Sequence, residues 1–156
     1  MQNLSTELEG AALDAIIDGL MQGLSETAVV TMKAQNYHWN VTGMSFGSLH
    51  ELFQEIYEDH FKAQDDLAER IKALDGHVEG RLVEHVRRSK VEECDGRIPA
   101  EAMVAKLAGD EALLGRTMIA LAEVASKYGD TLTEDLAIAR GQVHEKFAWL
   151  LRAHIK

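Results

Sequence analysis

Apolar residues recur at spacings of three and four along four long stretches of the chain, the pattern of amphipathic helices that bury one face. The stretches run from about Leu8 to His38, from Ser48 to Leu74, from Pro99 to about Lys127, and from Thr131 toward the C-terminus. Between the second and third, the segment RLVEHVRR predicts a short helix inside a long connection. The pattern therefore predicts an all-α four-helix bundle with one crossover.

One long crossover among four helices is the connectivity of ferritin-like bundles. The length of 156 residues and the absence of repeats or linkers predict one domain spanning 1–156, with 1–7 as a short N-terminal tail. The chain shows no signal-peptide pattern and no apolar run long enough to cross a bilayer. The single cysteine, Cys94, excludes an internal disulfide and fits a reducing compartment, so we expect a cytoplasmic protein.

The net charge of −10 argues against a broad nucleic-acid-binding surface, because phosphate binding requires clustered Lys and Arg. The one basic run, RLVEHVRRSK, contains a Glu and is typical of a solvated loop or short helix. An acidic excess also attracts cations to pores and cavities. The charge thus favours cations over nucleic acid as partners.

Many ferritin-like bundles hold two metal ions in the core through Glu-x-x-His motifs on two helices. In this chain no Glu is followed by His three residues later. The sequence therefore argues against a di-iron centre of that kind within one bundle.

A different set of metal-ligand types surrounds the turn between the first two helices. His38 and His50 flank the turn, and Asp65 and Glu69 follow on the second helix, spaced so that they share a face. His50 and Asp65 are fifteen residues apart, about 22 Å along a helix, so one subunit cannot bring all four to one ion. Two second helices packed antiparallel in a two-fold dimer can, and the ligands suit Fe(II), Zn(II) or Mn(II). The alternative is a solvated acidic pair and packed, hydrogen-bonded histidines.

The sequence HWNVTGMSFGSLHELF, followed by a Tyr and by DDLAERIKALDGH, resembles the Dps family, the miniferritins or DNA-binding proteins from starved cells. The closing DTLTEDLAIARGQVHEKFAWLLRAHI is similar to the last helix of that family. The resemblance extends from about residue 10 to the end of the chain.

The resemblance implies a hollow dodecamer, in the bacterial cytoplasm or associated with the nucleoid, that oxidises Fe(II) with hydrogen peroxide or dioxygen and stores a ferric mineral. His38 and His50 match the two iron-binding histidines of one chain, and Asp65 and Glu69 match the carboxylates of its neighbour. Trp39 matches an aromatic residue that intercepts oxidising equivalents, unless it is only a packing residue.

Two further expectations concern iron binding and entry. Many members carry an acid where this chain has Gln54, so we expect one ferrous ion to bind firmly and the second weakly. Asp135 and Glu145 match acids that line three-fold pores, although exposed helix acids are common.

Three functions remain open from the sequence. The leading one is a ferroxidase that stores iron and protects DNA from oxidative damage. The alternative is a DNA-coating protein that protects by physical binding, against which the first ten residues, MQNLSTELEG, carry no Lys or Arg. The third is a catalytically silent helical module, which the four candidate ligands argue against.

Overall fold

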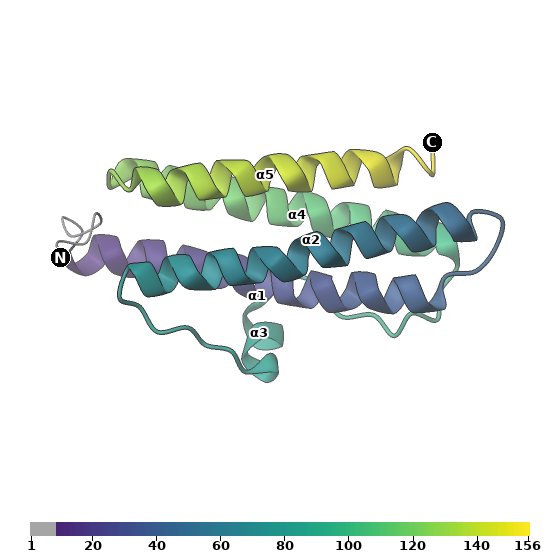
Figure 1. The fold of residues 1–156 in the computed structure, drawn as a ribbon, viewed down its shortest axis with the longest axis horizontal. Helices are drawn as coiled ribbons and strands as arrows, with labels where there is room; N and C mark the ends of the chain where they lie inside the picture. The colour runs from purple at the N-terminus through teal and green to yellow at the C-terminus, as the bar shows by residue number, and fades with distance from the viewer. Residues whose placement is uncertain (1–8) are drawn as a thin grey trace.

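A computed structural model describes residues 9–156 as four long helices and one short helix, with no strand in that range (Figure 1). The helices are α1 (Gly10–Asn40), α2 (Phe46–Ala73), α3 (Leu82–Arg88), α4 (Ala100–Lys127) and α5 (Thr131–Arg152). The predicted all-α bundle is confirmed. The tail predicted at 1–7 lies outside the described residues.

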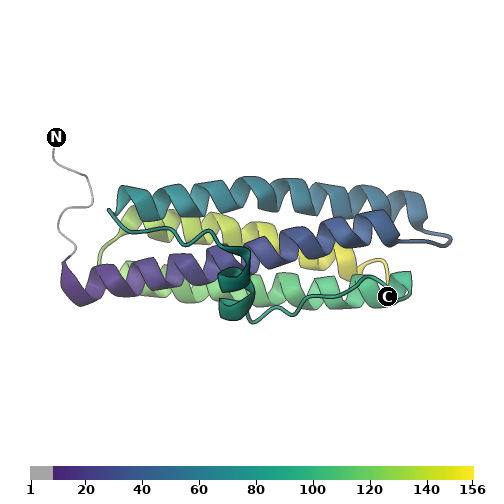
Figure 2. The ribbon, with the colours of Figure 1, turned by 90° about the horizontal axis from the view of Figure 1, so that it is seen from below.

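The bundle consists of two helical hairpins, α1–α2 and α4–α5, joined by the long connection that carries α3 (Figures 1 and 2). This connection runs along the outside of the bundle, and α3 packs against α1. His85 of α3 is buried and lies 3.0 Å from Ser25 Oγ through its Nδ1 atom. The predicted short helix is thus confirmed, and a buried polar contact holds it to the bundle.

Helix boundaries differ from the predicted ones by a few residues, and the differences have local causes. The second helix begins at Phe46, before Ser48, after a turn in which Gly43 has φ 106°. Thr131 is the first residue of α5, but the cap is Asp130, whose side chain accepts a hydrogen bond from the backbone N–H of Thr133. Gly129 (φ 74°) supplies the left-handed conformation that this turn requires.

Two apolar clusters form the core, one toward each end of the bundle. The first contains Phe53, Leu107 and Phe147, and the second contains Ile16 and Leu121. Between them lies a layer of fully or almost fully buried polar side chains: Glu26, His60, Glu111, Arg140 and His144. Charged side chains are seldom fully buried without partners, so this layer requires a physical explanation.

Within residues 9–156 no helix is long and apolar enough to span a membrane.

Candidate functional site

Two histidines meet at the end of the α1–α2 hairpin. His38 lies in the last turn of α1, and His50 lies in the second turn of α2. The two rings stack with their centroids 3.6 Å apart and their planes 15° from parallel. The short turn between the helices therefore brings the two imidazoles side by side.

Reciprocal hydrogen bonds fix the orientation of both rings. His38 Nδ1 lies 2.7 Å from the backbone oxygen of His50, and His50 Nδ1 lies 2.7 Å from the backbone oxygen of His38. A carbonyl oxygen only accepts, so each Nδ1 carries a hydrogen and the Nε2 of each ring is the nitrogen left for a metal ion. Metal-binding histidines are typically held in this way by a backbone carbonyl.

Aromatic side chains surround the histidine pair. Phe46 stacks on His50 at 5.0 Å, and Tyr57 meets His38 edge-on at 5.3 Å. Trp39, next to His38, is 60% exposed. It lines a surface groove on α1, α2 and α3 together with Phe61, which lies between His50 and Asp65 on α2. Each imidazole is therefore in contact with an aromatic side chain.

The predicted carboxylates do not reach the histidines of the same chain. Asp65 and Glu69 are exposed on α2, and neither side chain has an ion-pair or hydrogen-bond partner within residues 9–156. At about 100° per residue, His50, Asp65 and Glu69 lie within about 100° of one another around the helix. They therefore share a face without sharing a site in one subunit.

The remaining predicted positions are also on the surface. Gln54 donates from Nε2 to Glu58 Oε1 at 2.8 Å, so its amide is paired with an acid one turn further along α2. Asp135 and Glu145 are exposed on α5. Glu145 lines a groove between α4 and α5 together with Glu134, whereas Asp135 does not line it.

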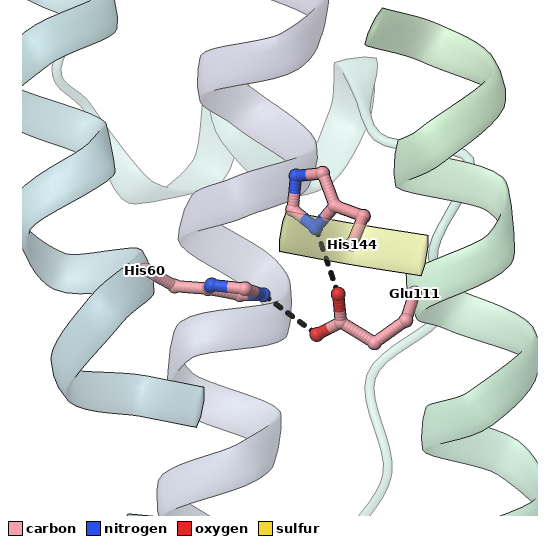
Figure 3. Close-up of side chains that lie close together, drawn as sticks. All are labelled: His60, Glu111 and His144. Carbon is pink, nitrogen blue, oxygen red and sulfur yellow. Dashed lines mark hydrogen bonds and ion pairs between the residues drawn. The ribbon is translucent and has the colours of Figure 1, made fainter. Parts of the chain in front are cut away.

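The polar layer in the core contains a cluster that the sequence did not reveal. His60 of α2, Glu111 of α4 and His144 of α5 are all 0% exposed (Figure 3). His60 Nε2 lies 2.6 Å from Glu111 Oε1, and His144 Nδ1 lies 2.7 Å from Glu111 Oε2. One nitrogen of each ring and the carboxylate lie within 4.8 Å of one another. We call these three residues the core cluster.

Asp59 and Arg140 lie next to the core cluster and hold His60 in place. Asp59 Oδ2 lies 2.9 Å from His60 Nδ1, and the Arg140 guanidinium in turn pairs with Asp59 at 2.9 Å. Both nitrogens of His60 therefore face carboxylate oxygens, which only accept, so both carry hydrogen and the ring is an imidazolium. His144 donates through Nδ1, and its buried Nε2 has no partner within residues 9–156.

The electrostatics of the core cluster follow from these contacts. Burial alone would lower the pKa of His60, but the charge of Glu111 and the hydrogen bonds to Asp59 and Glu111 outweigh it and raise that pKa. Burial alone would raise the pKa of Glu111, but the His60 charge and the hydrogen bonds from both imidazoles lower it to about 2. For His144 burial dominates and lowers the pKa.

Sequence reasoning missed this cluster because it searched for one local motif. The three residues come from three helices and are 51 and 33 positions apart, so no short pattern links them. The available signal was a polar residue at a core position of each helix. His60 lies four residues after buried Ile56, and Glu111 lies four residues after buried Leu107.

The chain matches the model of the ferritin-like domain family over residues 17–156. It is 31% identical over 140 residues to DNA protection during starvation protein 2 of Bacillus anthracis, covering 90% of this chain and 96% of that protein.

Solved structures of Dps proteins have a similar fold. The crystal structure of Dps from Staphylococcus aureus has a TM-score of 0.89 and 31% identity, covering 92% of this chain and 96% of that one. A Dps protein from Vibrio cholerae O1, described as a member of a broad superfamily of ferritin-like diiron-carboxylate proteins, has a TM-score of 0.92 and 27% identity, covering 100% and 98%.

Proposed function

The chain belongs to the ferritin-like family and, within it, to the Dps proteins, and from this premise we propose that it is an iron-storing ferroxidase. In this proposal it takes up Fe(II) as substrate at sites shared between subunits of a hollow dodecamer. It oxidises the iron with hydrogen peroxide or dioxygen and retains the ferric product as a mineral. The observation that carries the proposal is the histidine pair, whose reciprocal hydrogen bonds leave the Nε2 of each ring for a metal ion.

The proposed site needs a second subunit. His38 and His50 supply imidazoles from one chain, and Asp65 and Glu69 of a neighbouring chain supply carboxylates. Because Asp65 and Glu69 are exposed and have no side-chain partner within residues 9–156, a two-fold axis across α2 can bring them to the histidines at low cost. The same operation makes two equivalent sites in each dimer.

An apolar surface supports this arrangement. Met32, Trp39, Phe61 and Leu82 are exposed on α1, α2 and α3, and all four line one groove. Exposed apolar patches of this kind typically mark protein interfaces. Phe61 lies on α2 between His50 and Asp65, about one turn from the midpoint around which an antiparallel contact between two copies of α2 would be centred.

The reaction needs little from the protein beyond binding. Two ferrous ions give one electron each to hydrogen peroxide, its O–O bond breaks, and with two protons it leaves as two water molecules. Each one-electron step outside the site would release hydroxyl radical, so paired oxidation protects DNA. In the proposal, Trp39 beside His38 intercepts oxidising equivalents that escape this pairing.

The proposal also covers how iron enters the shell and how DNA is protected. Asp135 and Glu145, exposed on α5, would attract Fe(II) at three-fold pores. Direct binding to DNA is not part of the proposal, because the net charge of −10 in each chain repels phosphate. Protection of DNA would follow from iron and peroxide removal in the cytoplasm.

Replacing His50 and Asp65 by alanine together is expected to slow Fe(II) oxidation by at least about tenfold. Mutation of a residue that only supports a metal ligand typically costs about 10- to 100-fold, so the loss of two ligands should cost no less. The measurement is ferric absorbance after one addition of hydrogen peroxide to protein loaded anaerobically with Fe(II). The matched control is His154→Ala with Asp66→Ala, two exposed or partly exposed residues of the same types. Equal slow rates in wild type and variant, with the assembly intact, would rule the interfacial ferroxidase out.

Replacing Gln54 by Glu is expected to convert weak binding of a second ferrous ion into tight binding. A carboxylate at this position supplies charge and a ligand that the amide lacks, and it also ends the Gln54–Glu58 hydrogen bond. Anaerobic calorimetric titration of Fe(II) measures the effect. The prediction fails if wild type already binds two ions per interface with equal, high affinity.

A further inference from the structure

The core cluster is an unusual way to fill the middle of a helical bundle. Three ionisable side chains of metal-ligand type are removed from water, at a cost that apolar side chains of similar size would not incur. The layer divides the apolar core into two clusters. A group of this kind is either a closed ion-pair network or a site for a ligand.

A closed network leaves no polar atom unpaired, and the core cluster does not meet this condition. Within the cluster, His144 Nε2 is buried and unpartnered within residues 9–156, and so is Nε of Arg140 in the same layer. Glu26, in the same layer, provides the contrast. Its carboxylate accepts hydrogen bonds from Gln22, from Thr117 and from the backbone N–H of Lys90, so both of its oxygens are satisfied. Unpaired buried groups are rare and commonly mark a functional role.

The core cluster also has the supports of a metal site. Asp59 holds His60 through Nδ1, which leaves Nε2 directed at Glu111, and Arg140 holds Asp59. A carboxylate–histidine pair of this type orients a ring and raises its basicity as a ligand. Glu111 bridges the two imidazoles with its two oxygens, so two nitrogens and a carboxylate already surround one point.

From this arrangement we propose that His60 Nε2, His144 Nδ1 and the Glu111 carboxylate bind one divalent transition-metal ion inside each subunit. Two imidazoles and one carboxylate suit Zn²⁺ or Fe²⁺, and they disfavour Mg²⁺, Ca²⁺ and thiolate-preferring ions. The site lies within one chain and needs no neighbour. It therefore does not depend on the site proposed between subunits.

The protons and charges that change on metal binding can be accounted for with the groups present. His60 loses its Nε2 proton to solvent and becomes a neutral ligand that still donates from Nδ1 to Asp59. The His144 proton moves from Nδ1 to the unpartnered Nε2, so the ring stays neutral and takes the tautomer that binding requires. One divalent ion replaces one proton. The cluster gains one positive charge, which a metal-bound hydroxide can neutralise.

The groove between α4 and α5 is the part of the surface next to His144. Gly115 and Gly141 line this groove, and Glu134 and Glu145 lie along it. A Cβ atom added at Gly115 would lie 3.8 Å from the Cβ of His144. The groove therefore passes next to the start of the His144 side chain, and its two acids attract cations to this part of the surface.

The test counts tightly bound metal in protein whose interfacial ligands have been removed. The His50→Ala, Asp65→Ala variant is incubated with Zn²⁺ at pH 7, passed over a desalting column and analysed for zinc by elemental mass spectrometry. We expect one zinc per chain. Adding His144→Leu is expected to reduce the zinc count to near zero. Adding His154→Leu instead, which replaces an exposed histidine near the C-terminus, is expected to leave the count at one.

A second measurement guards against misfolding of the His144→Leu variant. Zn²⁺ is expected to raise the unfolding midpoint of the His50→Ala, Asp65→Ala protein, because an ion that binds only the folded state stabilises it. A zinc count near zero and no shift in that protein would overturn the proposal. The interfacial proposal is judged separately, by the rate of Fe(II) oxidation in wild type.

Discussion

Replacing Phe61 by Glu is expected to dissociate the assembly and, with it, to abolish fast Fe(II) oxidation while leaving the helices folded. Phe61 is 72% exposed in the single chain, so a charge there costs the isolated subunit little. In an antiparallel contact that pairs His50 of one α2 with Asp65 of the other, the two introduced glutamates would lie within about two helical turns of each other, in a contact that excludes water. Removing apolar area and adding like charges both oppose association. Light scattering measures the particle mass, and peroxide-driven ferric absorbance measures the activity.

The matched control is Phe61→Leu, which keeps an apolar side chain at the same place. It is expected to retain the particle mass and most of the oxidation rate. Circular dichroism separates dissociation from unfolding in the Phe61→Glu variant, because an intact bundle keeps its helical signal. A Phe61→Glu protein with the mass and oxidation rate of wild type would place the interface elsewhere.

Helices were predictable because their signal is local and repeated. The predicted stretches Leu8–His38 and Ser48–Leu74 correspond to α1 and α2 with end shifts of about two residues. Ends shift because capping depends on single side chains, as with Asp130 in place of Thr131 before α5. The bundle connectivity followed from loop lengths, since only the segment that carries α3 is long.

The two clusters differ in how far the sequence could reveal them. His38 and His50 belong to one hairpin and twelve residues of sequence, so their proximity follows from a turn. Their pairing with Asp65 and Glu69 depends on a second chain, and it stays a prediction. His60, Glu111 and His144 meet only because three separate helices align in register, which no periodicity of one helix specifies.

Replacing Glu111 by Gln is expected to destabilise the metal-free bundle by about 3–5 kcal/mol, the typical cost of leaving a buried charge without its partner. Glu111 is 0% exposed and accepts from both imidazoles, whereas a glutamine amide has one accepting oxygen and directs N–H groups at the other ring. Urea unfolding followed by circular dichroism, at equal chain concentration, measures the difference. The control, Glu101→Gln, changes an exposed acid on the same helix and is expected to cost less than about 1 kcal/mol.

The pH dependence of the free energy of unfolding tests whether the Glu111–His60 ion pair causes this loss of stability. Glu111 has a lowered pKa of about 2, so its contribution is fully present above its ordinary value of 4.5 and is lost as the pH falls through about 2. His60 has a raised pKa, so its contribution is fully present below 6.5 and is lost as the pH rises through that raised value. The stability gap between wild type and Glu111→Gln is therefore expected to be largest between pH 4.5 and 6.5 and to narrow on both sides. A gap that is constant with pH would mean that Glu111 acts through shape and hydrogen bonding instead of charge.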